Sequence, residues 1–351
     1  MDLEGKRVLL TGGTGSLGKA LVRRILNGEM GRPKSVTVFS RDEGKHHQMK
    51  VDWKHLKVAT DDIFYRNFEE LLKFRVGDVR DCASVVTAVR QAEVVFHAAA
   101  LKQVPSCEYF PAEAVRTNVE GAINLVRAVR ENDTPVELVV GISTDKACKP
   151  VNVMGMTKSL QERILLEGNL GQDKTAFTCV RYGNVIASRG SVVPLFRYQI
   201  QQGGPVTITS REMTRFLISL DQAVDTVFDC VRHGSRGETF VPRLPSTKII
   251  DLVEVMLNGQ AIPVVEIGVR PGEKLHEILI SEEEMVRTTE RDNYYVIASV
   301  LPEVGNNYAK TPPLVGEYSS QHAVLDRTGL HDLLVKAGEM KVDQLSVGLS
   351  N

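Results

Sequence analysis

The sequence has almost no net charge, and this argues against several classes of partner. Its 43 lysine and arginine residues nearly balance its 44 aspartate and glutamate residues, which leaves a formal net charge of -1 over 351 residues. A nucleic-acid-binding surface or an electrostatic membrane anchor needs an excess of positive charge. We therefore expect neither nucleic acid nor a membrane among the partners.

Cysteines and long apolar runs are also scarce. The five cysteines are odd in number, and none of them is paired at the close spacing of a zinc site. No apolar run is long enough to cross a bilayer, and no basic-plus-apolar signal precedes the first strand. We expect a cytoplasmic protein with reduced thiols and no metal site.

Apolar strands alternate with helical stretches over the first half of the chain. Strands are predicted at residues 6–10, 36–39, 74–76, 93–97, 137–142 and 178–181, whereas residues 44–73 are predicted to be irregular and partly helical. This alternation predicts an α/β fold with a Rossmann-type, doubly wound parallel sheet.

Three regions follow from this pattern. Residues 1–185 are expected to form an NADP-binding Rossmann domain, with a later contribution from around residues 215–260. Shorter elements and more loop predict a smaller substrate-binding lobe over residues 186–286. Residues 287–351 carry few periodic signals and are expected to form a C-terminal extension.

A glycine-rich turn joins the first strand to the helix that follows. Glycines at this position let the backbone approach a pyrophosphate, which the N-terminus of the helix attracts. A purely structural turn is the alternative, but the order of strand, glycine turn and helix favours a dinucleotide site. Its residues are Gly12, Thr14, Gly15, Ser16, Leu17 and Gly18.

The end of the second strand bears on the choice of cofactor. An arginine there accommodates a 2′-phosphate, whereas an acidic residue binds the ribose hydroxyls of NAD. Ser40 and Arg41 come first and favour NADP, while Asp42 keeps NAD possible. The alternative is that Arg41 is a solvent-exposed turn residue that does not bind the cofactor.

Polar and small residues after the next two strands are further cofactor candidates. The carboxylate of Asp78 could accept a hydrogen bond from the amino group of adenine. Small residues after the fourth strand leave room for the cofactor. Lys102 could reach a phosphate or a sugar hydroxyl, and Asn118 could steady the neighbouring loop. The remaining candidates are Val79, Ala98, Ala99 and Ala100.

The most reactive side chains follow the fifth strand, where an open α/β sheet does its chemistry. Thr144, Asp145 and Lys146 stand there, and Lys158 lies on the next helix. Met154 stands four residues before Lys158, and a thioether takes no part in proton transfer.

These motifs resemble the extended short-chain dehydrogenase/reductase superfamily, and within it the UDP-N-acetylglucosamine 4,6-dehydratases of bacterial polysaccharide and glycan biosynthesis. Eight motifs between about residues 5 and 280 carry the resemblance. They lie at residues 11–18, 39–43, 77–81, 97–105, 143–149, 181–194, 213–216 and 270–277.

The resemblance implies a reaction and roles for the residues after the fifth strand. The sugar C4 hydroxyl is oxidised, water is lost across C5 and C6, and the hydride returns to C6. By similarity Lys146 is the base at C5, Asp145 the acid at C6, and Thr144 bonds the C4 oxygen. Lys158 holds the nicotinamide ribose. Most of the superfamily has tyrosine at position 154, so Asp145 or a water held by it takes the C4 hydroxyl proton.

The resemblance also implies a ligand set. The substrate is UDP-N-acetylglucosamine or a close UDP-sugar, the cofactor is NADP or NAD, and the chain forms a homo-oligomer, a hexamer or a dimer. Tyr182, Asn184 and Val185 join the cofactor site. The substrate residues are Lys102, Thr144, Asn184, Arg189, Ser191, Val192, Pro194, Thr207, Arg215, Arg270 and Glu273.

Two other functions stay open. A UDP-sugar 4-epimerase shares the C4 oxidation but usually relies on tyrosine, which Met154 replaces. A non-catalytic NADP-binding sensor or assembly protein would explain Met154, but it has no need to keep Asp145, Lys146 and Lys158. Reprotonation of C5 can occur from either face, so the sequence leaves the product's stereochemistry undetermined.

Overall fold

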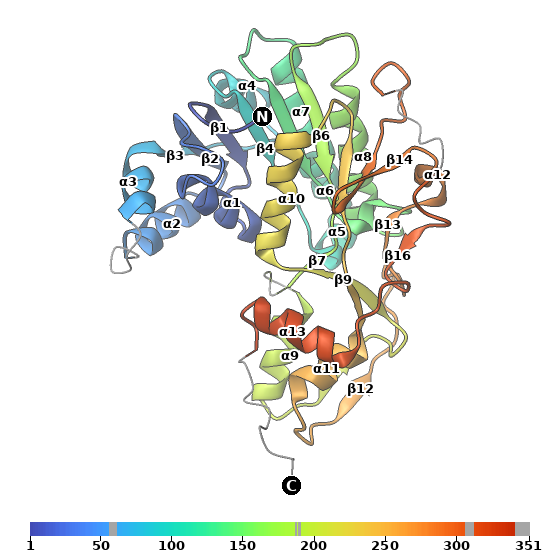
Figure 1. The fold of residues 1–351 in the computed structure, drawn as a ribbon. Coiled ribbons are helices and arrows are strands. Elements are labelled where there is room, and N and C mark those ends of the chain that lie inside the picture. Colours follow the sequence, from blue (N-terminus) through green and yellow to red (C-terminus); the bar gives the residue numbers. More distant parts are fainter. Residues whose placement is uncertain (56–61, 187, 189–190, 306–311, 341–351) are drawn as a thin grey trace. The chain divides into compact units, whose positions relative to one another are not determined.

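The computed structural model describes residues 1–55, 62–186, 188, 191–305 and 312–340. The chain divides into two compact units (Figure 1). The first comprises Met1–Tyr182, Asp221–Arg243 and Ile278–Tyr318. The second comprises Gly183–Leu220, Leu244–Glu277 and the chain from Ser319 onward.

A nine-stranded sheet runs through the first unit in the order β14-β15-β10-β6-β5-β4-β1-β2-β3. The seven strands from β10 to β3 are parallel, and they include the order 3-2-1-4-5-6 of a doubly wound fold. The predicted Rossmann-type fold is therefore confirmed. The strands are β1 (Arg7–Thr11), β2 (Ser35–Ser40), β3 (Leu72–Val76), β4 (Val94–His97), β5 (Leu138–Ile142), β6 (Ala176–Val180), β10 (Thr239–Pro242), β14 (Thr288–Arg291) and β15 (Tyr294–Ile297).

Helices cover both faces of this sheet, which explains why its central strands are continuously apolar. All five residues of β5 are buried, and so are all four of β4. Helices α4 (Cys82–Val89), α7 (Gly121–Arg130) and α8 (Val153–Glu167) pack on one face through a shared apolar cluster. Helices α1 (Ser16–Leu26) and α10 (Leu220–His233) lie on the other face (Figure 1).

Two segments are more regular than the sequence pattern predicted. Residues 44–73 contain helices α2 (Glu43–His55) and α3 (Asp62–Leu71), where Trp53 and Phe68 make an edge-to-face contact. The mostly polar composition of α2 hid the two apolar residues that it buries, Met49 and Trp53. After residue 287, β14 and β15 extend the main sheet antiparallel, because the hairpin pairs its strand β15 with the exposed edge of β10.

Short elements complete the first unit. They are α5 (Val104–Tyr109), α6 (Pro111–Ala114), a π-helical turn (Val115–Glu120), a 3-10 turn (Asp145–Ala147), β13 (Ile278–Ile280) and α12 (Glu282–Met285). β16 (Tyr318–Ser319) lies where the chain passes into the second unit.

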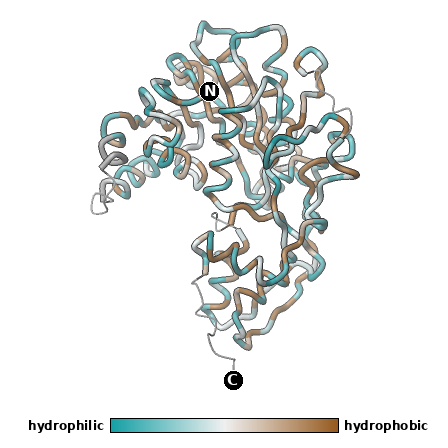
Figure 2. The backbone as a smooth tube through the Cα atoms, in the orientation of Figure 1, coloured by the Kyte–Doolittle hydropathy of each residue, from teal (hydrophilic) through white to brown (hydrophobic). Residues whose placement is uncertain are grey.

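The second unit has its own small sheets and its own core. α11 (Ile249–Leu257) buries Ile249, Leu252, Val253 and Leu257, which recur at helical spacing on one face. This face packs against α9 (Val192–Gln201) and α13 (Arg327–Lys336). Apolar and polar residues alternate along the tube in this part of the chain (Figure 2). The sheets consist of β7 (Asn184–Val185), β9 (Thr214–Ile218) and β11 (Ser246–Lys248), and of β8 (Val206–Ile208) with β12 (Val264–Glu266).

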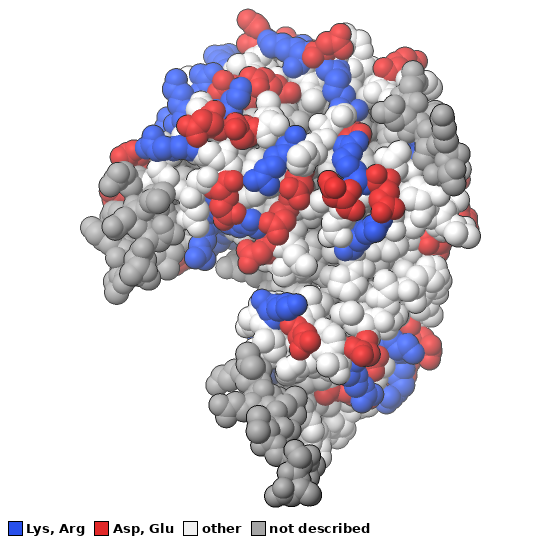
Figure 3. All heavy atoms as spheres, viewed as in Figure 1, with Lys and Arg blue, Asp and Glu red and all other residues white. Residues whose placement is uncertain are grey.

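Three further observations concern the surface charge, membrane-spanning helices and metal-binding clusters. Basic and acidic side chains are interspersed over the face drawn in Figure 3, in keeping with the balanced composition. No helix in the described part of the chain has both the length and the apolar character needed to cross a membrane. Within the same residues, no cluster of three His, Cys, Asp or Glu side chains is placed to hold a metal ion.

Candidate active site

The glycine turn after β1 is packed so tightly that two of its positions require glycine. Gly12 has φ +68°, and a Cβ atom there would lie 2.7 Å from the backbone nitrogen of Ala99. A Cβ atom on Gly18 would lie 2.5 Å from the Cα atom of Gly13. These approaches bring the start of α1 and the residues after β4 against the turn. The unpaired N–H groups of the first turn of α1 are suited to a phosphate.

The residues after β2 and β3 form a charged group next to this turn. Arg41 is half exposed, and its Nη1 lies 3.8 Å from Oδ2 of Asp78. Asp78 also accepts from the backbone and guanidinium of Arg80 at 2.7–3.0 Å. Burial acts to raise the pKa of Asp78, but the bonds from Arg80 and the charges of Arg80 and Arg41 hold it below its usual value.

The two other polar residues at the end of β2 already have partners. The Ser40 hydroxyl lies 2.7 Å from Nε2 of His46, and the Asp42 carboxylate pairs with Lys45 at 2.8 Å. Val79, which the sequence assigned to the cofactor, is buried in the apolar cluster under α7. Of the two charged cofactor candidates after β2 and β3, Arg41 is therefore more exposed than Asp78.

Asn118 links the loop after β4 to α8. It is fully buried in the π-helical turn, an irregularity that often occurs at functional sites. Its side chain exchanges two hydrogen bonds with the backbone of Leu101 and donates to Thr157 Oγ1 at 2.9 Å. The loop fixed in this way also carries Ala100 and the exposed Lys102.

The residues predicted to be catalytic meet at the end of β5. The fully buried Asp145 accepts at Oδ1 from the Thr144 hydroxyl at 2.9 Å and from the Lys146 ammonium at 3.0 Å. The backbone of Asp145 is held by a hydrogen bond to the carbonyl of Tyr182, 3.0 Å away. The Lys146 side chain is 21% exposed, so an ionisable group next to the buried carboxylate remains accessible.

Lys158 reaches the same strand end from α8. Its ammonium donates to the carbonyl of Ile142, the last residue of β5, and to Oε1 of Gln161 at 2.7 Å. Burial lowers the pKa of Lys158 to about 8, an effect that the charge of Glu162 partly offsets. Lys158 is therefore mostly cationic at neutral pH, but close to losing its proton.

Met154 contributes only apolar contacts. It is buried in a small cluster with Cys107 and Ala114, beside Leu101 and Val104. A thioether in this surrounding fills space and cannot replace the proton transfer of a tyrosine hydroxyl.

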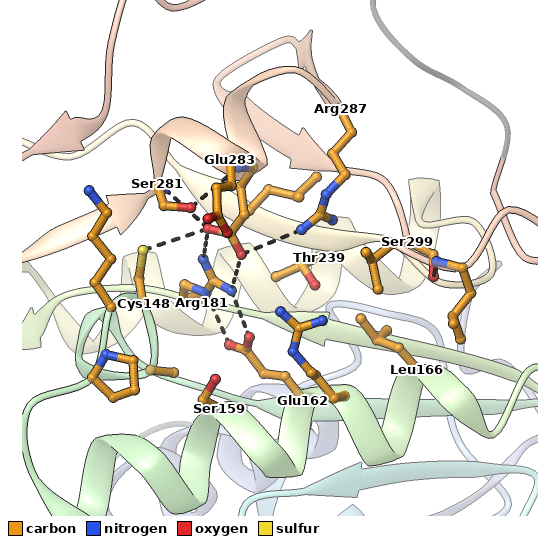
Figure 4. A pocket seen from close by; sticks show the side chains of 18 of the residues that line it. Cys148, Ser159, Glu162, Leu166, Arg181, Thr239, Ser281, Glu283, Arg287 and Ser299 are labelled. Carbon is orange, nitrogen blue, oxygen red and sulfur yellow. Dashed lines mark hydrogen bonds and ion pairs between the residues drawn. The ribbon is translucent and has the colours of Figure 1, made fainter.

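Two buried groups near this motif were missed by the sequence reasoning. His97, at the end of β4, lies 2.9 Å from Thr11 Oγ1, and burial lowers its pKa to about 3, so it is neutral. Arg181, just after β6, is clamped between Glu162 and Glu284 by bonds of 2.6–3.0 Å (Figure 4). A charged residue directly after a buried strand was the available signal, but its partners lie far away in the sequence.

The second unit holds most of the residues assigned to the sugar nucleotide. Among these assigned residues, two buried oxygen atoms have no hydrogen-bond partner in the described chain: Oγ of Ser191 and Oε2 of Glu273. Ser191 is the N-cap of α9, whose first turn contains Val192 and Pro194. Glu273 closes a turn with the exposed Arg270, its amide lying 3.1 Å from the Arg270 carbonyl.

The other predicted residues of this unit have structural partners or lie outside the described chain. The buried Arg215 donates to the carbonyls of Thr214, Lys274 and Leu275, so it supports the segment after Glu273. The Thr207 hydroxyl accepts from Gln199 at 2.8 Å. Asn184 and Val185 form β7, and Arg189 lies outside the described residues.

The strand order and the glycine turn after β1 define an α/β protein with the Rossmann-type, doubly wound fold. Residues 8–299 match the polysaccharide biosynthesis protein family, and the chain belongs to that family.

Comparison with known proteins agrees with this membership. An uncharacterized membrane protein of Methanocaldococcus jannaschii is 43% identical over 83% of this chain and 85% of its own length. A UDP-glucose 4-epimerase of Rickettsia bellii is 42% identical over 87% of this chain and 86% of its own length.

Solved structures share the fold. The structure of Pen from Bacillus thuringiensis is 33% identical, covers 97% of this chain and 100% of its own, and has a TM-score of 0.85. A dTDP-glucose 4,6-dehydratase from Streptomyces venezuelae, solved with NAD bound, is 18% identical over 77% of this chain and 86% of its own, with a TM-score of 0.64. At that identity the likeness shows the fold alone.

Proposed function

We propose that this chain is an NAD(P)-dependent enzyme of the nucleotide-sugar dehydratase and epimerase type, and specifically a UDP-N-acetylglucosamine 4,6-dehydratase. The single observation that carries the proposal is the arrangement after β5. A buried carboxylate and an accessible amine lie 3.0 Å apart there, and the residue at the usual tyrosine position, Met154, is buried among apolar side chains. Dehydration needs an acid and a base acting at neighbouring carbons, and this pair supplies both.

The residues present fit a dinucleotide. Glycine is required at Gly12 because the backbone passes so close to Ala99, and the first turn of α1 offers unpaired amides to a pyrophosphate. Lys158 would hold the nicotinamide ribose, and Arg41 would meet a 2′-phosphate. When bound, the nicotinamide would supply the redox chemistry, which is the reversible transfer of a hydride between cofactor and sugar.

The proton transfers in this proposal balance without a tyrosine. Asp145, as a carboxylate, takes the proton of the C4 hydroxyl while Thr144 bonds the C4 oxygen. Lys146, in its neutral form, removes the proton from C5, which the C4 ketone has made acidic. Asp145 then gives its proton to the C6 hydroxyl, which leaves as water. Lys146 finally returns a proton to C5, so both side chains recover their starting states.

The second unit would bind the nucleotide part of the substrate. The buried oxygen atoms of Ser191 and Glu273 have no described partner, and a ligand with ribose or uracil donors would satisfy them. Arg270 is exposed beside Glu273 and suits a diphosphate. Arg215 would act indirectly, because its bonds to the carbonyls of Lys274 and Leu275 shape this segment.

A UDP-sugar 4-epimerase is the second candidate, and the name of the Rickettsia relative favours it. Epimerisation needs a reversible proton transfer at C4, with no role for a base at C5. The buried, apolar Met154 cannot supply the usual tyrosine hydroxyl. We therefore favour dehydration, and the two reactions differ in the mass of the product.

Product mass tests the proposal directly. The protein is incubated with NADP and UDP-N-acetylglucosamine, with UDP-glucose as a second substrate, and the products are analysed by mass spectrometry. Loss of one water is expected. An epimer of unchanged mass would support the epimerase, and no turnover of either sugar would support a binding protein. In deuterated water, NMR of the product reports from which face C5 is reprotonated.

The Asp145→Asn variant tests the assigned role. It keeps the size of the side chain but removes its ability to carry a proton, so dehydration should fall by at least about a hundredfold. Cofactor binding, measured by fluorescence titration, should be retained. Substantial residual turnover with intact cofactor binding would refute the double role of Asp145.

We also propose that the chain forms a homo-oligomer through the first unit. Tyr109, Phe110, Ile123, Met156 and Leu160 are exposed on the neighbouring elements α5, α7 and α8. An exposed apolar group of this kind typically marks an interface.

A further inference from the structure

A cavity of about 460 Å³ lies within the first unit, apart from the glycine turn and the ends of β2, β3 and β4 (Figure 4). Its walls come from α8, from β10 and β15, and from the segment around α12. None of the predicted cofactor residues is among the residues that line the cavity. Its volume is in the range of small-molecule sites.

Several polar groups of this wall have no protein partner. Thr239 is only 3% exposed, yet its hydroxyl makes no hydrogen bond with any described residue. The side chains of Ser159 and Arg163 on α8 likewise make no hydrogen bond or ion pair within the described chain. A hydroxyl that lines a cavity without a protein partner is available to a ligand or to water.

The charged residues of the lining balance in number, so the preference for a ligand depends on which of them lacks a partner. The basic ones are Lys149, Arg163, Arg181 and Arg287, and the acidic ones are Glu162, Glu167, Glu283 and Glu284. Arg181 is fully engaged with Glu162 and Glu284, and Arg287 lies 4.0 Å from Glu284. The guanidinium of Arg163 makes no ion pair within the described residues, and its planar fork suits an oxyanion.

The remaining walls are apolar or repel a highly charged ligand. Leu166, Ile297 and Leu301 line the cavity and would cover a hydrocarbon or aromatic body. Glu283 is exposed at the same cavity and disfavours a ligand with several negative charges. We propose that this cavity is a second small-molecule site, which binds a compact organic anion through a carboxylate or phosphate group held by Arg163 and Thr239.

The cavity is next to the motif after β5. Ala147 and Cys148 line it and directly follow Asp145 and Lys146. The Cys148 thiol also donates to Glu284 Oε2 at 3.6 Å, which ties this turn to the charged wall. A bound anion would therefore change the turnover of the enzyme. This consequence rests on the proposed function, whereas binding itself does not.

Binding to the whole protein tests the site with three probes of similar shape. Benzoate carries a carboxylate, phenyl phosphate carries a phosphate, and benzamide is the neutral control. Titration calorimetry and thermal unfolding are measured in saturating NADP and without UDP-sugar, so that anion sites in the cofactor cradle are occupied. We expect benzoate or phenyl phosphate to bind and to raise the unfolding temperature, and the stronger of the two identifies the anionic group. Benzamide should have no effect.

Three variants locate the binding. Arg163→Gln removes the exposed guanidinium and should weaken the preferred anion at least about tenfold. Thr239→Val keeps the shape of the wall and should weaken binding to a smaller degree. Arg127→Gln, an exposed arginine on α7 that does not line the cavity, is the matched control and should bind as the wild type does.

Three results would overturn the proposal. They are the absence of binding of both anions at millimolar concentration, equal binding of benzamide, and equal losses in the Arg163 and Arg127 variants. Each is distinct from a failure of the proposed function, which would appear as an unchanged mass of UDP-N-acetylglucosamine whatever the anion does.

Discussion

The buried charge cluster around Arg181 makes the sharpest prediction about stability. Glu284 accepts from Arg181 at 2.8 and 2.9 Å and from the backbone of Ser281 at 3.1 Å. The side chains of Arg181 and Glu284 are only 4% and 14% exposed, so water screens their attraction weakly. The variant Glu284→Gln keeps the shape of the side chain but removes its charge, which leaves Arg181 with Glu162 alone.

The pKa of Glu284 gives the expected magnitude. Burial alone would raise it, but the charge and hydrogen bonds of Arg181 lower it from 4.5 to about 2. Each pKa unit corresponds to about 1.4 kcal/mol, so this shift in pKa contributes roughly 3 kcal/mol to the free energy of unfolding. Because the folded pKa is the lower one, this stability is fully present above pH 4.5 and is lost as the pH falls toward 2. Breaking a buried ion pair typically costs about 3–5 kcal/mol, which agrees with this value.

Urea unfolding at neutral pH measures the effect. Glu284→Gln should lower the free energy of unfolding by about 3 kcal/mol, and below pH 4.5 it should lose less stability than the wild type does. Glu283→Gln is the matched control, because Glu283 is the exposed neighbour of Glu284 and makes no ion pair with a described residue. This substitution should change the free energy of unfolding by less than about 0.5 kcal/mol. Equal effects of the two variants would refute the reasoning.

Three further predictions concern binding and assembly. Cofactor affinity should fall as the pH rises through about 8, where Lys158 loses its proton, and a flat fluorescence titration across this range would contradict its role. Arg41→Gln should weaken NADP by about tenfold and leave NAD unchanged in the same titration; equal losses would show that Arg41 does not meet a 2′-phosphate. Leu160→Asp should shift the mass measured by light scattering toward the monomer, and an unchanged mass would exclude this helix face as the interface.

The fold could be predicted well because its signals are local. Apolar strands of four to six residues, each followed by a turn and a helix, repeat along the first half of the chain, and the predicted Rossmann-type sheet is confirmed. The glycine turn was also a local signal, since strand, glycines and helix follow one another directly. The roles of Asp145, Lys146 and Lys158 remain predictions that the proposed assays address, although the structure brings all three to the end of β5.

What the sequence could not give depends on contacts between distant residues. Asn118 lies in a π-helical turn and bonds Leu101 and Thr157, and no local pattern announces that irregularity. The antiparallel hairpin of β14 and β15 joins the sheet only because β10 offers it an unpaired edge.

By itself, then, the sequence determined the class of fold, the cofactor turn and the position of the reactive motif, because short-range periodicity and motif order encode them. Tertiary structure alone decided that Arg181 sits between Glu162 and Glu284, which lie 19 residues before it and 103 residues after it. It also decided that the resulting charged wall borders a cavity beside the motif. Electrostatic environments arise from side chains that only folding brings together, and so they are absent from any local pattern of residues.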